Sequence, residues 1–215
     1  MPSLKEIKNR ITSVQSTRKI TSAMKMVASS KLHHAQMMIE NMLPYENLLE
    51  SMLKTYLEAE VDARTVLTLP REVKKAALVV FASNSSLCGG FNANVLKMMQ
   101  QAVDGYKKRG VEVIIYPVGR KVSEKVNKLG LNTAGNFNSL ADKPNARDCV
   151  KIGEELQELF RKDEIDAVEM IYHHFKSAGS QILLTKKLLP IDVEKAMDYD
   201  HTRDLENNVV TAGVQ

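Results

Sequence analysis

The sequence contains no tryptophan, two cysteines, few aromatic residues and no long hydrophobic run. A helix needs roughly 20 consecutive apolar residues to cross a bilayer, and no stretch of this chain approaches that length, so we expect any membrane association to be indirect. Residues 1–6 also lack the apolar core of a secretion signal. Cys88 and Cys149 have no metal-type spacing, which is typical of free thiols in a reducing compartment. We therefore expect a cytoplasmic location.

No glycine occurs before Gly89, and Pro44 is the only proline between residues 3 and 57. Ser3 and Glu6 have the spacing of a capping box, which starts a helix. Two columns of mainly apolar residues then recur every seven positions, and we call them the seam. The columns are Ile7, Val14, Thr21, Ala28, Ala35, Met42, Leu49 and Tyr56, and Leu4, Ile11, Arg18, Lys25, Leu32, Ile39, Glu46 and Leu53. The pattern predicts one coiled-coil helix over residues 1–57, about 80 Å long, with a kink near Pro44.

Positive charge gathers in this helix. Residues 1–39 contain seven lysines and arginines against Glu6 alone, a net charge of +6, which leaves −2 of the total of +4 for the rest of the chain. A basic helix of this kind faces solvent or meets an acidic protein surface, anionic lipid or nucleic acid. Charge alone leaves these alternatives open.

The pattern changes to short strands and helices after a polar linker at residues 58–75. Residues 76–82 are a continuous apolar run, which is typical of a strand buried on both faces. Further strands are expected at residues 111–116, 167–175 and 181–189, and helices at residues 92–109, 120–129 and 145–162. This order predicts an α/β domain over residues 76–190 with a mostly parallel sheet, whose last two strands are close enough to be antiparallel neighbours. Residues 191–215 are polar, and we expect a poorly ordered tail.

No pattern indicates an active site. The loop at residues 83–90 lies where α/β folds place ligands, but it has no G-x-G-x-x-G, and no P-loop motif occurs anywhere in the chain. We expect its serines to cap a helix and Cys88 to be a small buried hydrophobic residue. The adjacent histidine pairs at residues 33–34 and 173–174 diverge in direction, so neither resembles a metal chelate. We therefore expect no catalytic, cofactor-binding or metal-binding residues.

Two segments resemble a known family. Residues 4–32, LKEIKNRITSVQSTRKITSAMKMVASSKL, closely resemble the N-terminal helix of the gamma subunit of F-type ATP synthases, and residues 87–94, LCGGFNAN, resemble its glycine-containing turn. Weaker similarity occurs at residues 43–45, 71–74 and 172–181. The similarity covers most of residues 3–190 in order.

The resemblance implies an α/β fold in which a long N-terminal coiled-coil helix accompanies a small Rossmann-like domain. It implies a non-catalytic central-shaft (rotor) subunit of a proton- or ion-translocating synthase, which couples rotation of the membrane ring to ATP synthesis or hydrolysis on the beta subunits. The implied partners are the alpha and beta subunits, the epsilon subunit and the c-subunit ring, with no cofactor and no nucleic acid. The implied location is peripheral, on the cytoplasmic side of a bacterial cell membrane.

The family's beta subunits present an acidic loop to the shaft. By match to the family motif, Met24 lies at this rotor–beta contact, and Lys19 and Lys25 are candidate electrostatic contacts beside it. Arg71, in the matching Arg-Glu-Val-Lys segment, is a weaker candidate for a partner contact.

The chain departs from the family pattern in two places. Asn84-Ser85-Ser86 stands where the family usually has an aspartate and a basic residue, so a charge-dependent role of this turn is not expected. The family's long C-terminal helix, which forms the other half of the coiled coil, is also expected to be missing, because the sequence stops at Gln215. We therefore expect an exposed seam that self-associates or docks on another helix.

Two other functions remain as alternatives from the residues alone. One is a nucleotide-binding or flavin-binding α/β enzyme that uses residues 83–90. The other is a basic coiled-coil adaptor that binds nucleic acid, although the helix has little aromatic content and no recognisable reading motif.

Overall fold

The computed structural model describes residues 3–59, 65–177 and 179–192. The chain forms two compact units, Met1–Met52 and Leu53–Gln215. Residues 60–64 of the expected linker and residues 193–215 of the expected tail lie outside the described residues.

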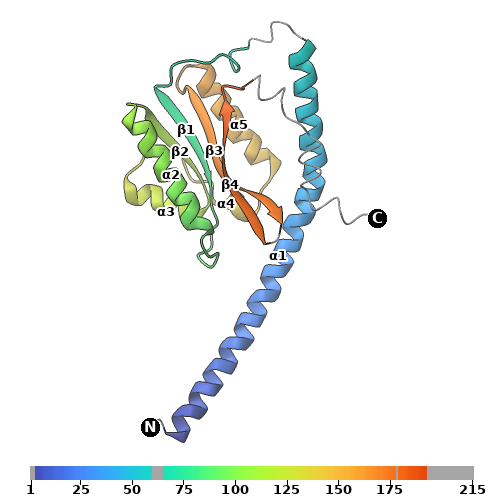
Figure 1. The fold of residues 1–215 in the computed structure, drawn as a ribbon, viewed down its shortest axis with the longest axis vertical. Coiled ribbons are helices and arrows are strands. Elements are labelled where there is room, and N and C mark those ends of the chain that lie inside the picture. The colour runs from blue at the N-terminus through green and yellow to red at the C-terminus, as the bar shows by residue number, and fades with distance from the viewer. Residues whose placement is uncertain (1–2, 60–64, 178, 193–215) are drawn as a thin grey trace. The chain divides into compact units, whose positions relative to one another are not determined.

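Helix α1 spans Leu4–Ala59 without a break (Figure 1). Ser3 Oγ accepts a hydrogen bond from the backbone N–H of Glu6 at 3.3 Å, which satisfies one of the amides left free at the helix start. The helix continues through Pro44, where one backbone donor is lost. None of the helices in the described part of the chain is long and apolar enough to cross a membrane.

The second unit contains a four-stranded sheet with the order β2-β1-β3-β4. Its strands are β1 (Lys75–Phe81), β2 (Glu112–Val118), β3 (Ala167–Ser177) and β4 (Ser180–Leu189). β1 pairs in parallel with both β2 and β3, whereas β3 and β4 pair in antiparallel fashion. The α/β fold with a long N-terminal helix and a mostly parallel sheet is therefore confirmed.

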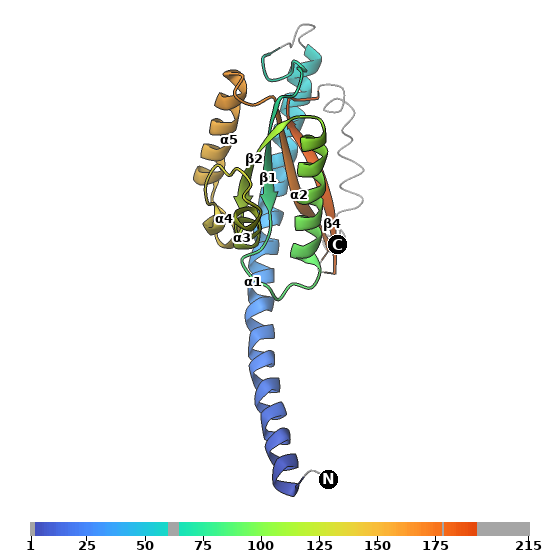
Figure 2. The same cartoon turned by 90° about the vertical axis from the view of Figure 1, so that its left-hand side faces the viewer.

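Helices cover both faces of this sheet. They are α2 (Phe91–Lys108), α3 (Arg120–Leu129), the short α4 (Asn138–Asp142) and α5 (Ala146–Arg161). One core cluster joins the sheet to α2 and α3, and a second joins it to α4 and α5. Figure 2 shows α2 and α5 on opposite sides of the sheet. Helix α4, which has only five residues, was not predicted from the sequence.

Strand β1 is the centre of both clusters. Leu78 and Val80 point into the first cluster, and Ala77 and Val79 point into the second. Successive side chains of a strand alternate between faces, so a strand covered on both faces has no position for a polar residue. This arrangement explains the continuous apolar run in the sequence.

Gly119 directly follows β2 and lies beside the backbone that follows β1. Its φ is +110°, a conformation that side-chain-bearing residues rarely adopt. A Cβ atom at this position would lie 2.1 Å from the carbonyl oxygen of Ala82, the residue after β1. The N–H of Ala82 donates to the Val118 carbonyl at 2.9 Å, so this backbone is held in place. Only glycine fits here.

We predict that Gly119→Ala lowers the free energy of unfolding by about 3 kcal/mol, because the new methyl group adds both steric overlap and backbone strain. Gly153→Ala in the interior of α5 is the control, since no atom lies within 4 Å of the new Cβ. The control should stabilise the protein by about 0.5–1 kcal/mol. Urea denaturation measures both, and equal effects of the two substitutions would contradict the assignment.

Candidate partner interface on the long helix

The seam of α1 is exposed in the described structure. Nine of its large apolar side chains retain between 39% and 87% of their accessible surface, and Ile39 is half-buried. The nine are Leu4, Ile7, Ile11, Val14, Leu32, Met42, Leu49, Leu53 and Tyr56. Exposed apolar surface of this extent marks a site of protein interaction. The seam is therefore the first candidate functional surface.

The three contact residues expected on α1 all lie on its surface. Met24 is 50% exposed, and Lys19 and Lys25 are exposed. A helix turns by about 100° per residue, so Lys25 lies about 100° and Lys19 about 140° around the axis from Met24. The three side chains do not form one patch. They surround the helix at one level, an arrangement that suits partners on more than one side.

A shallow groove of about 460 Å³ runs along the seam at the same level. Small hydroxyl side chains line it between Val14, Arg18 and Lys25. Thr17 Oγ1 and Thr21 Oγ1 donate to the carbonyls of Ser13 and Thr17, each at 2.9 Å. These hydroxyls are bonded to their own helix, so the groove presents mainly methyl groups between two cations.

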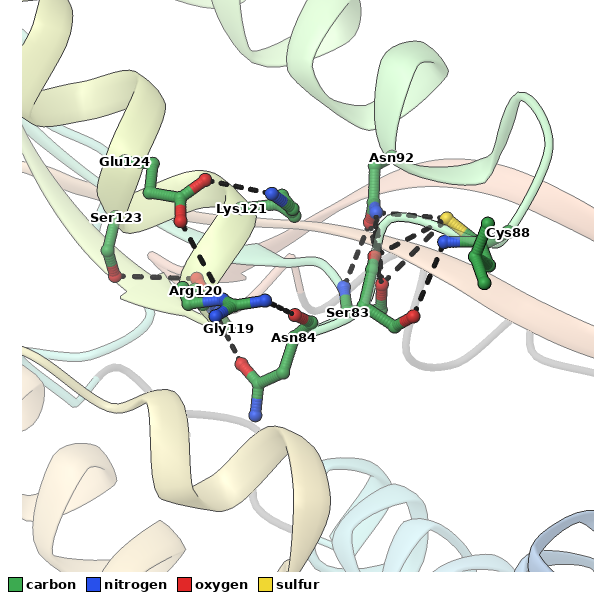
Figure 3. A network of polar contacts seen from close by, with 11 residues as sticks. Ser83, Asn84, Cys88, Asn92, Gly119, Arg120, Lys121, Ser123 and Glu124 are labelled. Atoms are coloured by element: carbon green, nitrogen blue, oxygen red, sulfur yellow. Dashed lines mark hydrogen bonds and ion pairs between the residues drawn. The ribbon is translucent and has the colours of Figure 1, made fainter. Parts of the chain in front are cut away.

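The loop after β1 is closed by Asn92, whose side chain is buried (Figure 3). Its Oδ1 accepts from the N–H of Ser83 at 3.0 Å, and its Nδ2 donates to the carbonyl of Ser85 at 2.8 Å and to Cys88 Sγ at 2.9 Å. Two expectations were wrong. Gly90 is the N-cap of α2 and has no side-chain bond, so the serines do not cap this helix. Cys88 is half-buried and lies in a polar network rather than in the core.

Asn84 ties the same loop to the start of α3. Its Oδ1 accepts from the N–H of Arg120 at 2.7 Å, and its carbonyl accepts from Arg120 Nη2 at 2.6 Å (Figure 3). Glu124 lies one turn away, and the hydrogen bond from Lys121 holds its pKa below the ordinary value, with Arg120 contributing in the same direction. The loop's polar groups are bonded within the domain, so this geometry lends no support to the nucleotide-binding alternative.

The part of the chain that the structure describes contains no cluster of three or more histidine, cysteine or carboxylate side chains that could hold a metal ion.

Arg71 is half-buried at the edge of the domain, with 22% of its side chain exposed. It forms an ion pair with Asp163, and its Nε lies 3.3 Å from Asp166 Oδ1. Its Nη2 donates to the carbonyls of Phe160 and, at 2.9 Å, of Ile165. The guanidinium also stacks over the Phe160 ring at 3.8 Å. These contacts brace the connection between α5 and β3, and the expected partner contact of Arg71 stays a prediction.

Asp166 is the residue that the sequence analysis missed. It is buried, and its Oδ2 accepts from the N–H groups of Lys74 and Lys75, each at 2.9 Å. Asp166 therefore joins the start of β1 to the start of β3 through Arg71 and two backbone amides. The sequence feature that could have indicated this role is the position of Asp166, an acidic residue directly before a buried strand.

The comparisons with known proteins agree on one family. The family model described as "ATP synthase" matches residues 3–212. The ATP synthase gamma chain of Phocaeicola vulgatus is 52% identical over 215 residues, which cover 100% of this chain and 74% of the relative. The gamma chain of Bacteroides fragilis is 51% identical over 211 residues, which cover 98% of this chain and 73% of the relative.

A solved structure shows the same fold. The central stalk and c-ring structure of the Tetrahymena thermophila mitochondrial ATP synthase contains a chain that matches with a TM-score of 0.59 and 22% identity. The match covers 84% of both chains. With the family model and the close relatives, it explains why one long helix precedes a small α/β domain. The chain belongs to the gamma-chain family of the F-type ATP synthase, and it is a non-catalytic, central-shaft subunit of that rotary complex.

Proposed function

We propose that α1 of this chain stands inside the ring of alpha and beta subunits and that Met24, Lys19 and Lys25 contact the beta subunits. The observation that carries the proposal is the basic, exposed surface of α1 around Met24. An acidic loop on each beta subunit complements this surface. Because the three residues point in different directions, the shaft offers each beta subunit a different side.

This asymmetry is the physical basis of coupling. A rotor can bias a beta subunit only if its contacts differ between that subunit's conformations. The cation contacts are rim contacts, each worth about 0.2–1 kcal/mol and screened by salt. Weak individual contacts suit a shaft that must release each beta subunit in turn.

The other proposed partners follow from the same family. The α/β domain contacts the epsilon subunit and the c-subunit ring, and through that ring the chain is a peripheral protein on the cytoplasmic side of a bacterial cell membrane. Ion translocation takes place in the membrane ring, so the chain transmits torque and carries no ion. The two curated relatives described above are bacterial, which supports this location.

We predict that Met24→Lys in the assembled synthase lowers the number of ions pumped per ATP hydrolysed. An added cation forms a further ion pair with the acidic loop of the beta subunit. About 1 kcal/mol of extra attraction slows the release of that beta subunit from the shaft about fivefold. Proton or ion pumping into vesicles, compared with ATP hydrolysis on the same sample, measures the effect.

Met38→Lys is the matched control, because Met38 occupies the same heptad position about 21 Å further along the helix. It should leave coupling unchanged. Equal loss in both variants, or full coupling in Met24→Lys, would contradict the contact.

We predict that Lys19→Ala combined with Lys25→Ala weakens binding of the chain to the alpha–beta ring about fivefold to tenfold at low ionic strength. The difference should disappear at high salt, since screening removes the same interaction. A binding titration across a salt series tests this. Lys97→Ala with Lys128→Ala removes two exposed cations from the domain helices and should have no effect on ring binding.

Arg71 is the weakest of the proposed partner contacts, because its guanidinium is already bound within the domain. We predict that Arg71→Lys lowers the free energy of unfolding by about 2 kcal/mol, since lysine keeps the charge but loses the planar fork. Arg147→Lys, at an exposed position, should change it by less than about 0.5 kcal/mol. Full stability of Arg71→Lys together with weaker subunit assembly would establish a partner contact instead.

A further inference from the structure

An aromatic stack joins β3 to the start of α2. The ring of His173 in β3 lies 4.1 Å from the ring of Phe91, measured between centroids, at an interplanar angle of 21°. Phe91 is the first residue of α2, and its N–H donates to the Cys88 carbonyl at 3.2 Å. The next residue, Asn92, bonds the loop at residues 83–90. The stack therefore holds both the first turn of α2 and this loop against the sheet.

One nitrogen of the His173 ring is buried and unpaired. His173 is half-buried, and its Nδ1 has no hydrogen-bond partner among the residues that the structure describes. In the neutral ring with its proton on Nε2, Nδ1 is an acceptor without a donor. In the imidazolium both nitrogens are donors, so a buried N–H of a cation would lack an acceptor. The charged form costs more free energy here, because desolvation penalties are larger for charged groups.

The start of α2 also disfavours a cation at His173. The free N–H groups of a helix N-terminus carry a partial positive charge. The N-cap of α2 is Gly90, which offers these groups no side-chain hydrogen bond. Between residues 83 and 96 the sequence contains no charged side chain, and Cys88 is the only titratable one. Arg120 of α3, which binds the carbonyl of Asn84 in the loop, is itself a cation and pairs with Glu124.

The strands beside His173 supply no counter-ion. Glu169 is the one carboxylate of β3, and it lies four residues earlier on the same face, about 13 Å along the strand. It is the register partner of Lys187 in β4. The other charged or titratable groups of β1, β3 and β4 lie at the far end of β1 or on alternate positions that point to the opposite face. They are Lys75, Tyr172, His174, Lys176 and Lys186. Burial is therefore uncompensated, and it lowers the pKa of His173.

We propose that His173 and Phe91 form an acid-sensitive latch, in which protonation of His173 releases the first turn of α2 and the loop at residues 83–90 from β3. The neutral ring keeps the stack, whereas the cation reaches water only when the stack opens. Because folding lowers the pKa of His173 from 6.5, the latch is fully stable above pH 6.5 and weakens as the pH falls below it. The opening is local. The latch lies within the α/β domain and does not depend on the contacts proposed for α1.

The reactivity of Cys88 in the whole chain tests the latch. With Cys149→Ser as background, Cys88 is the only thiol, and its reaction with dithiodipyridine reports opening of the loop. His173→Phe retains an aromatic ring against Phe91 but cannot be protonated. Dividing the background rate by the rate of His173→Phe at each pH cancels the ionisation of the thiol itself. This ratio should rise at least about fivefold between pH 7.5 and pH 5, since protonation leaves a buried donor unsatisfied. An unchanged ratio overturns the proposal.

Two further variants separate the latch from a purely structural role. His174→Phe is the matched control, because the neighbouring side chain is exposed and points to the opposite face. It should keep the pH dependence of the background. His173→Gln loses the ring and cannot be protonated, so it should open the loop equally at both pH values. The proton NMR signal of His173, assigned by its absence in His173→Phe, should titrate with a pKa below 6.5. A pKa of 6.5 or above, loss of the pH dependence in His174→Phe, or its persistence in His173→Gln overturns the proposal.

Discussion

A single α-helix has no interior in which to bury apolar side chains, and this constraint determines how α1 can be stabilised. α1 contains 56 residues, and its apolar side chains stay largely exposed over its length. A helix of this kind takes most of its stability from packing an apolar face on a partner rather than from the propensities of its residues. The shaft therefore depends on contacts with other helices and subunits for its stability.

The α/β domain meets the opposite condition, because its central strand is covered on both sides. β1 is braced at its start by Asp166, which binds two backbone amides and Arg71. It is confined at its end by Gly119, where a side chain would overlap the Ala82 carbonyl. Ion pairs that are partly buried cost desolvation and are retained where they fix one arrangement. The central strand is therefore held in place at both of its ends.

The sequence predicted much of the fold because burial leaves clear patterns. The continuous apolar run of β1 and the seven-residue repeat of α1 located the main elements, and the family match identified the subunit. The loop after β1 was predicted wrongly, because Asn92 rather than the serines organises it. Residue spacing alone cannot show which of several nearby polar side chains forms the hydrogen bonds. The contacts of Arg71 within the domain were also missed, since its partner Asp166 lies 95 residues later in the chain.

The interruptions of the seam are concentrated where the proposed beta contact lies. Arg18 and Lys25 occupy seam positions at the level of Met24 and line the groove together with small hydroxyl residues. Such charges weaken helix pairing locally, but their long side chains reach from the seam to the rim. In the proposed arrangement, the same cations weaken helix pairing at this level and face the acidic loop of the beta subunits. A fully apolar seam would bind its partner helix more tightly and would leave no cations at this level for an acidic loop.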